Sequence, residues 1–347
     1  GTFINQGIIN HKGNGPGVYV GSKATVENFE NKGTIESKQK DGIEVNNSTI
    51  TNFKNSGTIQ GGWSGMFING AIIQTLINEG SIISKSSNDT DAGIGLQGGG
   101  TIATIINKGT IRSNAFGIGV VNGKFGKLIM QDGAVVHGTK YSGIIVGIGQ
   151  TLGDLEISGA NTKISGGQNG IFLSGNSKTQ KITIKDGARI EGGNNGISLR
   201  NGANLSGDIN ISGGARIEGG NNGIRAQSNT KISGDINISG GARIEGGNNG
   251  IRAQSNTKIS GDINISGGAK IKGENGIIAY TGAKISGDIN ISGGARIEGE
   301  LSGINLWDNT ELSGDMIISG QGSMIKGGKD AGIFNENSKI TGNITIS

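Results

Sequence analysis

The sequence predicts an all-β fold, a parallel β-solenoid (β-helix) of about 13 coils with roughly 27 residues per coil. The first observation is a tandem repeat, since residues 207–233 recur without one change as residues 234–260. The second is that apolar residues alternate at period two within the repeat, as Ile209 and Ile211 do, which is typical of strands with one buried face. The third is that glycine- and asparagine-rich segments, which tolerate the backbone angles of turns, separate these strands.

A repeat this short cannot bury its apolar face alone, so neighbouring units must stack, each strand pairing with its counterpart one repeat away. The alternative for evenly spaced short strands is a propeller or a sandwich. Both use antiparallel hairpins, and a propeller blade needs roughly 40 residues. No window shows the 3.6-residue stripe of an amphipathic helix, so we expect no helices.

The composition fits a single elongated domain over residues 1–347. Glycine supplies 70 of the 347 residues without a collagen triplet, and 32% hydrophobic with 4% aromatic residues suit a thin core of stacked isoleucines. There is no cysteine, which excludes disulfides and thiol chemistry. The net charge of +4 is scattered along the chain, so we expect no nucleic-acid partner.

The first strand of each coil is predicted from a recurring large apolar residue, with gaps of 23 to 29 residues between successive occurrences. The pattern is continuous from one end of the chain to the other, which predicts that every part of the chain belongs to the solenoid. The strand starts are Phe3, Phe29, Phe53, Leu76, Ile105, Leu128, Leu155, Ile182, Ile209, Ile236, Ile263, Ile289, Met316 and Ile344.

The third strand of each coil is predicted from a glycine followed by an apolar residue, which occurs once per coil. A glycine bend that enters the same strand in every coil would produce this spacing. The apolar residues are Val18, Ile43, Met66, Ile94, Ile118, Ile144, Ile171, Ile197, Ile224, Ile251, Ile277, Ile304 and Ile333.

One inward position of the first strand divides the chain into two groups of coils, which cover residues 1–127 and residues 128–347. It holds Asn5, Asn31, Asn55, Asn78 and Asn107 in the first group, and Met130 followed by isoleucines in the second. A stacked asparagine column can satisfy its own amides along the axis. We interpret it as a structural ladder rather than a ligand site.

Acidic residues were considered for catalysis, because solenoid enzymes that cleave polysaccharides use grouped carboxylates. Asp89 and Asp91 lie in a loop without a basic residue at matching positions of the next coils, and we interpret them as solvated. His11 and His137 lack metal-ligand spacing. A further column recurs in the GDIN turn, and we interpret it as Asx turn stabilisation rather than calcium binding: Asp208, Asp235, Asp262, Asp288 and Asp315. We expect no catalytic residue, no metal and no cofactor.

Two sets of outward residues are candidates for binding. Arginine and glutamate flank an inward isoleucine in the second strand, as Arg216 and Glu218 do, which indicates a solvated face or a lateral interface with a second molecule. Outward positions of the third strand combine aromatic residues and isoleucine with arginine, which favours a recognition surface, although single exposed apolar residues are ordinary. The candidate binding residues are Phe67, Ile145, Phe172, Arg225, Arg252, Ile278, Tyr280, Trp307 and Phe334.

Several sequence elements together point to a family. NxGxI segments begin at Asn31, Asn55 and Asn107, the glycine–isoleucine element recurs, cysteine is absent and the tandem repeats are nearly perfect. On these elements the whole chain resembles the passenger domain of bacterial autotransporter adhesins, the pertactin-type right-handed parallel β-helix. The resemblance implies a signal peptide before residue 1, a membrane barrel after residue 347, and a location at the bacterial outer membrane or outside the cell.

We therefore expect a non-enzymatic adhesin whose side binds a host cell-surface protein or glycan, or neighbouring molecules of its own kind. Any contact with the membrane would run through a barrel outside this chain. The alternatives are a passive stalk, which the identical repeats favour, and a polysaccharide-degrading enzyme, which would require carboxylates grouped in a groove.

Overall fold

The computed structural model describes residues 1–21 and 23–347. In these residues all regular structure is β-strand, arranged as a parallel β-solenoid of about 13 turns with about 27 residues per turn. The predicted fold class is thereby confirmed. The chain divides into two compact units, which we call unit 1 (Gly1–Ile157 and Asn161–Phe172) and unit 2 (Ser158–Ala160 and Leu173–Ser347). This division does not coincide with the end of the asparagine column at residue 107.

Each turn of unit 1 consists of three strands separated by tight turns. The first strands are β1 (Thr2–Asn5), β4 (Thr25–Asn31), β7 (Thr49–Asn55), β10 (Ile72–Asn78), β13 (Gly100–Asn107), β16 (Gly123–Met130) and β19 (Thr151–Ser158). The second strands are β2 (Ile8–His11), β5 (Thr34–Ser37), β8 (Thr58–Gly61), β11 (Ser81–Ser84), β14 (Thr110–Ser113), β17 (Val135–Gly138) and β20 (Lys163–Gly166). The third strands are β3 (Val18–Val20), β6 (Ile43–Asn46), β9 (Met66–Asn69), β12 (Ala92–Gln97), β15 (Phe116–Val120), β18 (Ser142–Val146) and β21 (Asn169–Ser174).

In unit 2 the first strand is split by a bend into two short pieces, and this bend contains Gly-Asp in the five turns that carry Asp208, Asp235, Asp262, Asp288 and Asp315. The leading pieces are β22 (Lys178–Thr179), β26 (Asn204–Leu205), β30 (Lys231–Ile232), β34 (Lys258–Ile259), β37 (Lys284–Ile285), β40 (Glu311–Leu312) and β44 (Lys339–Ile340). The following pieces are β23 (Ile182–Lys185), β27 (Ile209–Ile211), β31 (Ile236–Ile238), β35 (Ile263–Ile265), β38 (Ile289–Ile291), β41 (Met316–Ile318) and β45 (Ile344–Ile346).

The remaining strands of unit 2 are the second and third strands of each turn. The second strands are β24 (Arg189–Gly192), β28 (Arg216–Gly219), β32 (Arg243–Gly246) and β42 (Met324–Gly327), and the third strands are β25 (Asn195–Arg200), β29 (Asn222–Gln227), β33 (Asn249–Gln254) and β43 (Ile333–Glu336). Second and third strands are continuous in β36 (Lys270–Tyr280) and β39 (Arg296–Trp307).

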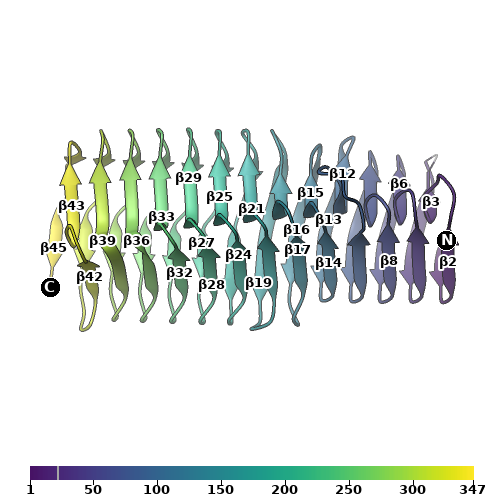
Figure 1. The fold of residues 1–347 in the computed structure, drawn as a ribbon, viewed down its shortest axis with the longest axis horizontal. Coiled ribbons are helices and arrows are strands. Elements are labelled where there is room, and N and C mark those ends of the chain that lie inside the picture. Colours follow the sequence, from purple (N-terminus) through teal and green to yellow (C-terminus); the bar gives the residue numbers. More distant parts are fainter. Residues whose placement is uncertain (22) are drawn as a thin grey trace. The chain divides into compact units, whose positions relative to one another are not determined.

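Within each unit, every strand pairs in parallel with its counterpart one turn away, as β25, β29 and β33 do (Figure 1). The register places predicted strand starts opposite one another, for example Phe29 opposite Phe3 and Phe53, and Ile236 opposite Ile209. The rings of the three phenylalanines stack at centroid distances of 4.4 and 4.7 Å. The core is therefore a set of one-residue-wide columns, as the alternation predicted.

Glycines at the entrance to the third strand allow the turns to approach closely. A Cβ atom on Gly223 would lie 2.8 Å from the carbonyl oxygen of Gly250 and 2.4 Å from a methyl group of Ile244. These distances are too short for any side chain, so the recurring glycine is required by the packing of one turn on the next.

The asparagine column of unit 1 forms a continuous chain of buried side-chain hydrogen bonds. The Nδ2 atom of Asn5, Asn31, Asn55 and Asn78 each donates to the Oδ1 atom of the asparagine in the following turn, at 2.8 Å in every case. Every member also donates to two backbone carbonyl oxygens, and the last member, Asn107, keeps these two hydrogen bonds, to Gly109 and Val135. No amide of the column is therefore left without a partner.

The aspartate column of unit 2 also links successive turns, and here the predicted Asx turn is wrong. The Oδ1 atom of each aspartate accepts the backbone N–H of the residue at the same position in the next turn. The backbone N–H of Asp235 donates to Asp208 Oδ1 at 3.0 Å, and the backbone N–H of Asp262 donates to Asp235 Oδ1 at 2.8 Å. The carboxylates thus satisfy donors of the neighbouring turn rather than donors of their own turn.

Candidate functional site

The third strands carry the outward positions that the sequence analysis singled out. In unit 1 the register brings six of these positions into one column, consisting of Tyr19, Glu44, Phe67, Gly95, Gly119 and Ile145. Phe67 and Ile145 are half-buried, as is Phe172 on β21. The two glycines therefore lie between large side chains on either side along the column.

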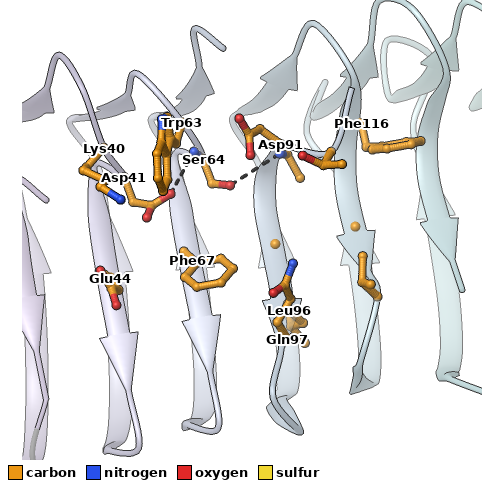
Figure 2. Close-up of a pocket in the computed structure, with 15 residues that line it drawn as sticks. Lys40, Asp41, Glu44, Trp63, Ser64, Phe67, Asp91, Leu96, Gln97 and Phe116 are labelled. Carbon is orange, nitrogen blue, oxygen red and sulfur yellow. Dashed lines mark hydrogen bonds between the residues drawn. The ribbon is translucent and has the colours of Figure 1, made fainter. Parts of the chain in front are cut away.

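A hollow of about 290 Å³ opens over the two glycines. Figure 2 shows the residues that line it, which come from neighbouring third strands and from the segments before them. Its lining consists of Lys40, Asp41, Glu44, Trp63, Ser64, Phe67, Thr90, Asp91, Ala92, Gly95, Leu96, Gln97, Phe116, Gly119 and Val121.

The rim of the hollow is built by the residues that precede the third strands. The backbone N–H of Ser64 donates to Asp41 Oδ1 at 2.8 Å, and the N–H of Ala92 donates to Ser64 Oγ at 3.4 Å (Figure 2). Lys40 Nζ lies 3.3 Å from the centroid of the Trp63 ring, a cation–π contact. Lys40 is thus the residue that contacts the Trp63 ring, and 41% of the surface of Trp63 stays exposed.

Asp41 has the most perturbed carboxyl group of the site. Its residue is only 4% exposed, and burial raises the pKa of its carboxyl from 3.8 to about 6. The nearby carboxylates of Glu44 and Asp91 raise this pKa further, whereas the Ser64 N–H and Lys40 act to lower it. The group therefore exchanges protons in mildly acidic solution.

The opposite wall is fixed by a cluster that spans several turns. The Phe116 ring stacks on Tyr141 at 5.3 Å, and the Tyr141 hydroxyl donates to Asp89 Oδ2 at 2.7 Å. Lys140 Nζ lies 2.6 Å from Asp89 Oδ1, and the hydrogen bond from Lys140 lowers the pKa of Asp89. Asp89 is exposed, as the interpretation of a solvated loop residue requires, but the expectation that it has no basic neighbour is wrong. Asp91, by contrast, accepts a hydrogen bond from Ser86 Oγ and lines the hollow.

In unit 2 the outward positions form two adjacent columns. The first contains Ser198, Arg225, Arg252, Ile278, Asn305 and Phe334, and the second contains Arg200, Gln227, Gln254 and Tyr280. Ile278 is only 9% exposed, so it offers little contact area although it occupies an outward position. Phe334 is half-buried.

The arginines of these columns face one another rather than carboxylates. Burial lowers the pKa of Arg225 and of Arg252, and the neighbouring guanidinium group lowers each further, from Arg200 for Arg225 and from Arg225 for Arg252. The Nε atoms of all three arginines are buried and make no hydrogen bond among the described residues. In the described part of the chain none of the three forms a salt bridge with a carboxylate, so positive charge is concentrated here.

An aromatic platform borders the arginines. Tyr280 and Trp307 stack at 5.3 Å with an interplanar angle of 11°, and Trp307 is 40% exposed. Arg252 lies over the Tyr280 ring at 5.1 Å and hydrogen-bonds to its hydroxyl. The hydroxyl in turn donates to Gln254 Oε1. We call Arg200, Arg225, Arg252, Tyr280 and Trp307 the arginine strip.

The sequence analysis missed Trp63, Asp41 and Phe116, because Asp41 and Trp63 belong to the turns before the third strand and Phe116 is the first residue of β15, so none of them stands at an outward position that the pattern marks. A signal was nevertheless present. The residue directly before the recurring glycine is asparagine in Asn195, Asn222, Asn249 and Asn275 but varies in unit 1, where Asp41, Ser64, Ala92, Phe116 and Ser142 occupy it.

Within the described ranges, no group of three or more histidine, cysteine or acidic residues could hold a metal ion. The same part of the chain contains no helix that could span a membrane. In comparisons with known proteins, no family model, no curated protein and no solved structure matches this chain.

Proposed function

We propose that this protein is a non-enzymatic adhesin, displayed on the bacterial surface or secreted, that binds its partner through the outer face of its third strands. The arginine strip is the observation that carries the proposal. Stacked guanidinium groups without carboxylates repel one another, and an anionic partner would relieve this repulsion. The neighbouring aromatic platform supplies the apolar contact area that is typical of binding hot spots.

The resemblance to autotransporter passenger domains supports the same proposal and adds the surface location. Repetition supports it as well, because Arg225 and Arg252 occupy the same position on successive turns, at about 4.8 Å. An extended acidic glycan or protein segment could contact several turns at once. Each contact would be weak, and the affinity would come from their number.

The proposal is tested by binding of the purified protein to cells and to immobilised acidic glycans at physiological salt. The variant is R225Q/R252Q, which we expect to weaken binding at least tenfold and to reduce its dependence on salt. The matched control is R216Q/R243Q, which removes the same charge from the second strands β28 and β32. Equal losses in both variants, or a parent protein that binds neither cells nor itself, would contradict the proposal.

A second candidate, a polysaccharide-cleaving enzyme, is favoured by one observation. Asp41, Glu44 and Asp91 line the same hollow, and a carboxyl with a pKa of about 6 suits a general acid. The test is the release of reducing ends from a polysaccharide panel between pH 5 and pH 7. Release that D41N and E44Q both abolish would establish this activity, whereas release by neither parent nor variants would exclude it for that panel.

A further inference from the structure

Gly95 and Gly119 differ from the glycines that the solenoid requires. A Cβ atom on Gly65 would lie 2.7 Å from the carbonyl oxygen of Gly93, so that position admits no side chain. A Cβ atom on Gly95 would meet Phe67 and Ser64 no closer than 3.6 Å, and one on Gly119 would lie 3.4 Å from Ala92 Cβ. Neither glycine has a positive φ angle. Backbone and packing would therefore accept side chains at both positions.

Glycine inside a strand weakens it, because it adds backbone freedom and no packing surface. At the same column position, other turns of unit 1 carry Tyr19, Glu44, Phe67 and Ile145. What the two glycines provide is space, since the hollow lies over them and side chains there would fill it. The space itself is the feature that calls for an explanation.

The lining of this space specifies the chemistry of an occupant. Trp63 and Phe67 offer apolar aromatic surface, against which the C–H face of a saturated ring can pack. Asp41, Glu44 and Asp91 offer carboxylate oxygens, which accept hydrogen bonds and donate none when ionised. At Asp41, Oδ1 accepts the Ser64 N–H, whereas Oδ2 has no hydrogen bond among the described residues. An occupant that combines an apolar face with several hydrogen-bond donors, such as hydroxyl groups, would match both parts of this lining.

The charge and the volume of the hollow restrict which ligands it can hold. Three carboxylates face the hollow, and its one cation, Lys40, is already placed over the Trp63 ring, so an anionic occupant would be repelled. A volume of about 290 Å³ lies at the lower end of ligand pockets, which range from about 300 to 1,000 Å³. This suits one sugar ring and not a longer piece of a glycan chain.

We propose that the hollow between Trp63, Phe67 and Phe116 binds a single neutral sugar residue, for example the terminal residue of a glycan. The ring packs on the aromatic side chains, and its hydroxyl groups donate to Asp41, Glu44 and Asp91. This site lies in unit 1 and takes an uncharged ligand, so it differs in place and in chemistry from the arginine strip of unit 2.

Tryptophan fluorescence provides the test, because the chain has two tryptophans and W307F leaves Trp63 as the sole reporter. The W307F protein is titrated with the methyl glycosides of glucose, galactose, mannose and N-acetylglucosamine. We expect a saturable fluorescence change with at least one of them. In the same background, G95L and G119L fill the hollow and should each weaken that binding at least tenfold.

The matched control is Y19L, which places leucine in the same column of unit 1 away from the lining of the hollow, and which should leave the affinity unchanged. Circular dichroism and the thermal midpoint show whether each variant is folded. If G95L is not folded, G119L alone decides the result, and D41N, which alters the polar wall without filling the hollow, decides it if neither leucine variant folds.

Three results would overturn the proposal. The first is the absence of saturable binding with all four glycosides, the second is unchanged affinity in the folded leucine variants, and the third is equal affinity for methyl glucuronide, which is anionic. The R225Q/R252Q protein should bind the sugar normally. A failure of the sugar-binding proposal can thereby be distinguished from a failure of the adhesin proposal.

Discussion

The two units use the position before the recurring third-strand glycine in opposite ways. In unit 2, Asn222, Asn249 and Asn275 are aligned, and each amide donates to the preceding one at 2.7 to 3.2 Å. In unit 1 the aligned residues include Ala92 and Phe116, which cannot bond to each other in this way. Identical residues satisfy one another along the stack, whereas different residues leave groups free to face a ligand.

The outward columns show the same contrast. Arg225 and Arg252 place the same charge at the same position of two identical turns. This enlarges the charged surface but forms no hollow in it. Gly95 and Gly119, flanked by Phe67 and Ile145, shape a hollow instead. Repetition thus favours many equivalent weak contacts, and divergence favours a single defined site.

The largest expected effect separates the glycines required by the solenoid from those of the hollow. G65A should lower the free energy of unfolding by about 3 kcal/mol, because the new methyl group meets the backbone of the next turn. G95A should raise it by about 0.5–1 kcal/mol, because alanine is less flexible in the unfolded chain. Urea unfolding monitored by circular dichroism measures both. Equal destabilisation by the two changes would show that Gly95 is also structural.

The next effect concerns Asp41, whose pKa in the folded state is about 6 against 3.8 for the ordinary carboxyl. Because the folded state favours the protonated form, the stability that this group contributes is present below about pH 3.8 and is lost as the pH rises through 6. Above pH 6 the loss is on the order of 3 kcal/mol at most. D41N retains an oxygen for the Ser64 N–H and should stabilise the protein at pH 8 but not at pH 4.

Thermal unfolding of parent and D41N at both pH values measures this difference. D89N is the control, because the pKa of Asp89 is lowered by Lys140 and its removal should not stabilise the protein at pH 8. Stabilisation by D41N that is the same at pH 4 and pH 8 would contradict the assignment to ionisation.

A smaller effect distinguishes the two ways of using the position before the glycine. N249A should lower the free energy of unfolding by about 1–3 kcal/mol, because it leaves Asn222 Oδ1 without its donor and Asn275 Nδ2 without its acceptor. S64A should cost less than about 1 kcal/mol, because Ser64 Oγ accepts only one long hydrogen bond, from Ala92. Chemical denaturation of both variants measures the two losses of unfolding free energy. A greater loss in S64A than in N249A would contradict the expected order.

The smallest change in local packing is expected from removing one whole repeat, residues 207–233. The turn that follows is identical in sequence, so the flanking strands meet the same partners, and the free energy of unfolding should fall only by the contribution of one turn and one interface between turns. Sugar binding in unit 1 should not change, whereas adhesion through the arginine strip should fall because Arg225 is lost. Undiminished cell binding would instead favour the passive stalk.

The columns of the solenoid could be predicted from the sequence because they follow a period. One large apolar residue per turn located Phe29 and Ile236, and each lies opposite its predicted partners. The hollow could not be predicted in this way. It depends on Trp63 and Asp41, which stand in turns outside the period-two pattern, and on the absence of side chains at Gly95 and Gly119.

Contacts across more than one turn were also beyond the pattern. Asp89 and Lys140 are 51 residues apart, and only the folded path of the loop between β11 and β12 brings them together. The outward position of Ile278 followed from the period, but its low exposure depends on how Arg252, Asn305 and other neighbours cover it.

The hydrogen-bonded asparagine column of unit 1 bears on how such a chain can change its length during evolution. Each inner member gives one hydrogen bond to the asparagine side chain of the following turn and receives one from the asparagine of the turn before, so a turn added or lost within the column leaves the number of unpaired groups unchanged. Recombination between similar turns would then be tolerated wherever both neighbours carry the same residue. The asparagine column therefore allows one turn to be exchanged for another, but only for a turn that also carries asparagine at this position.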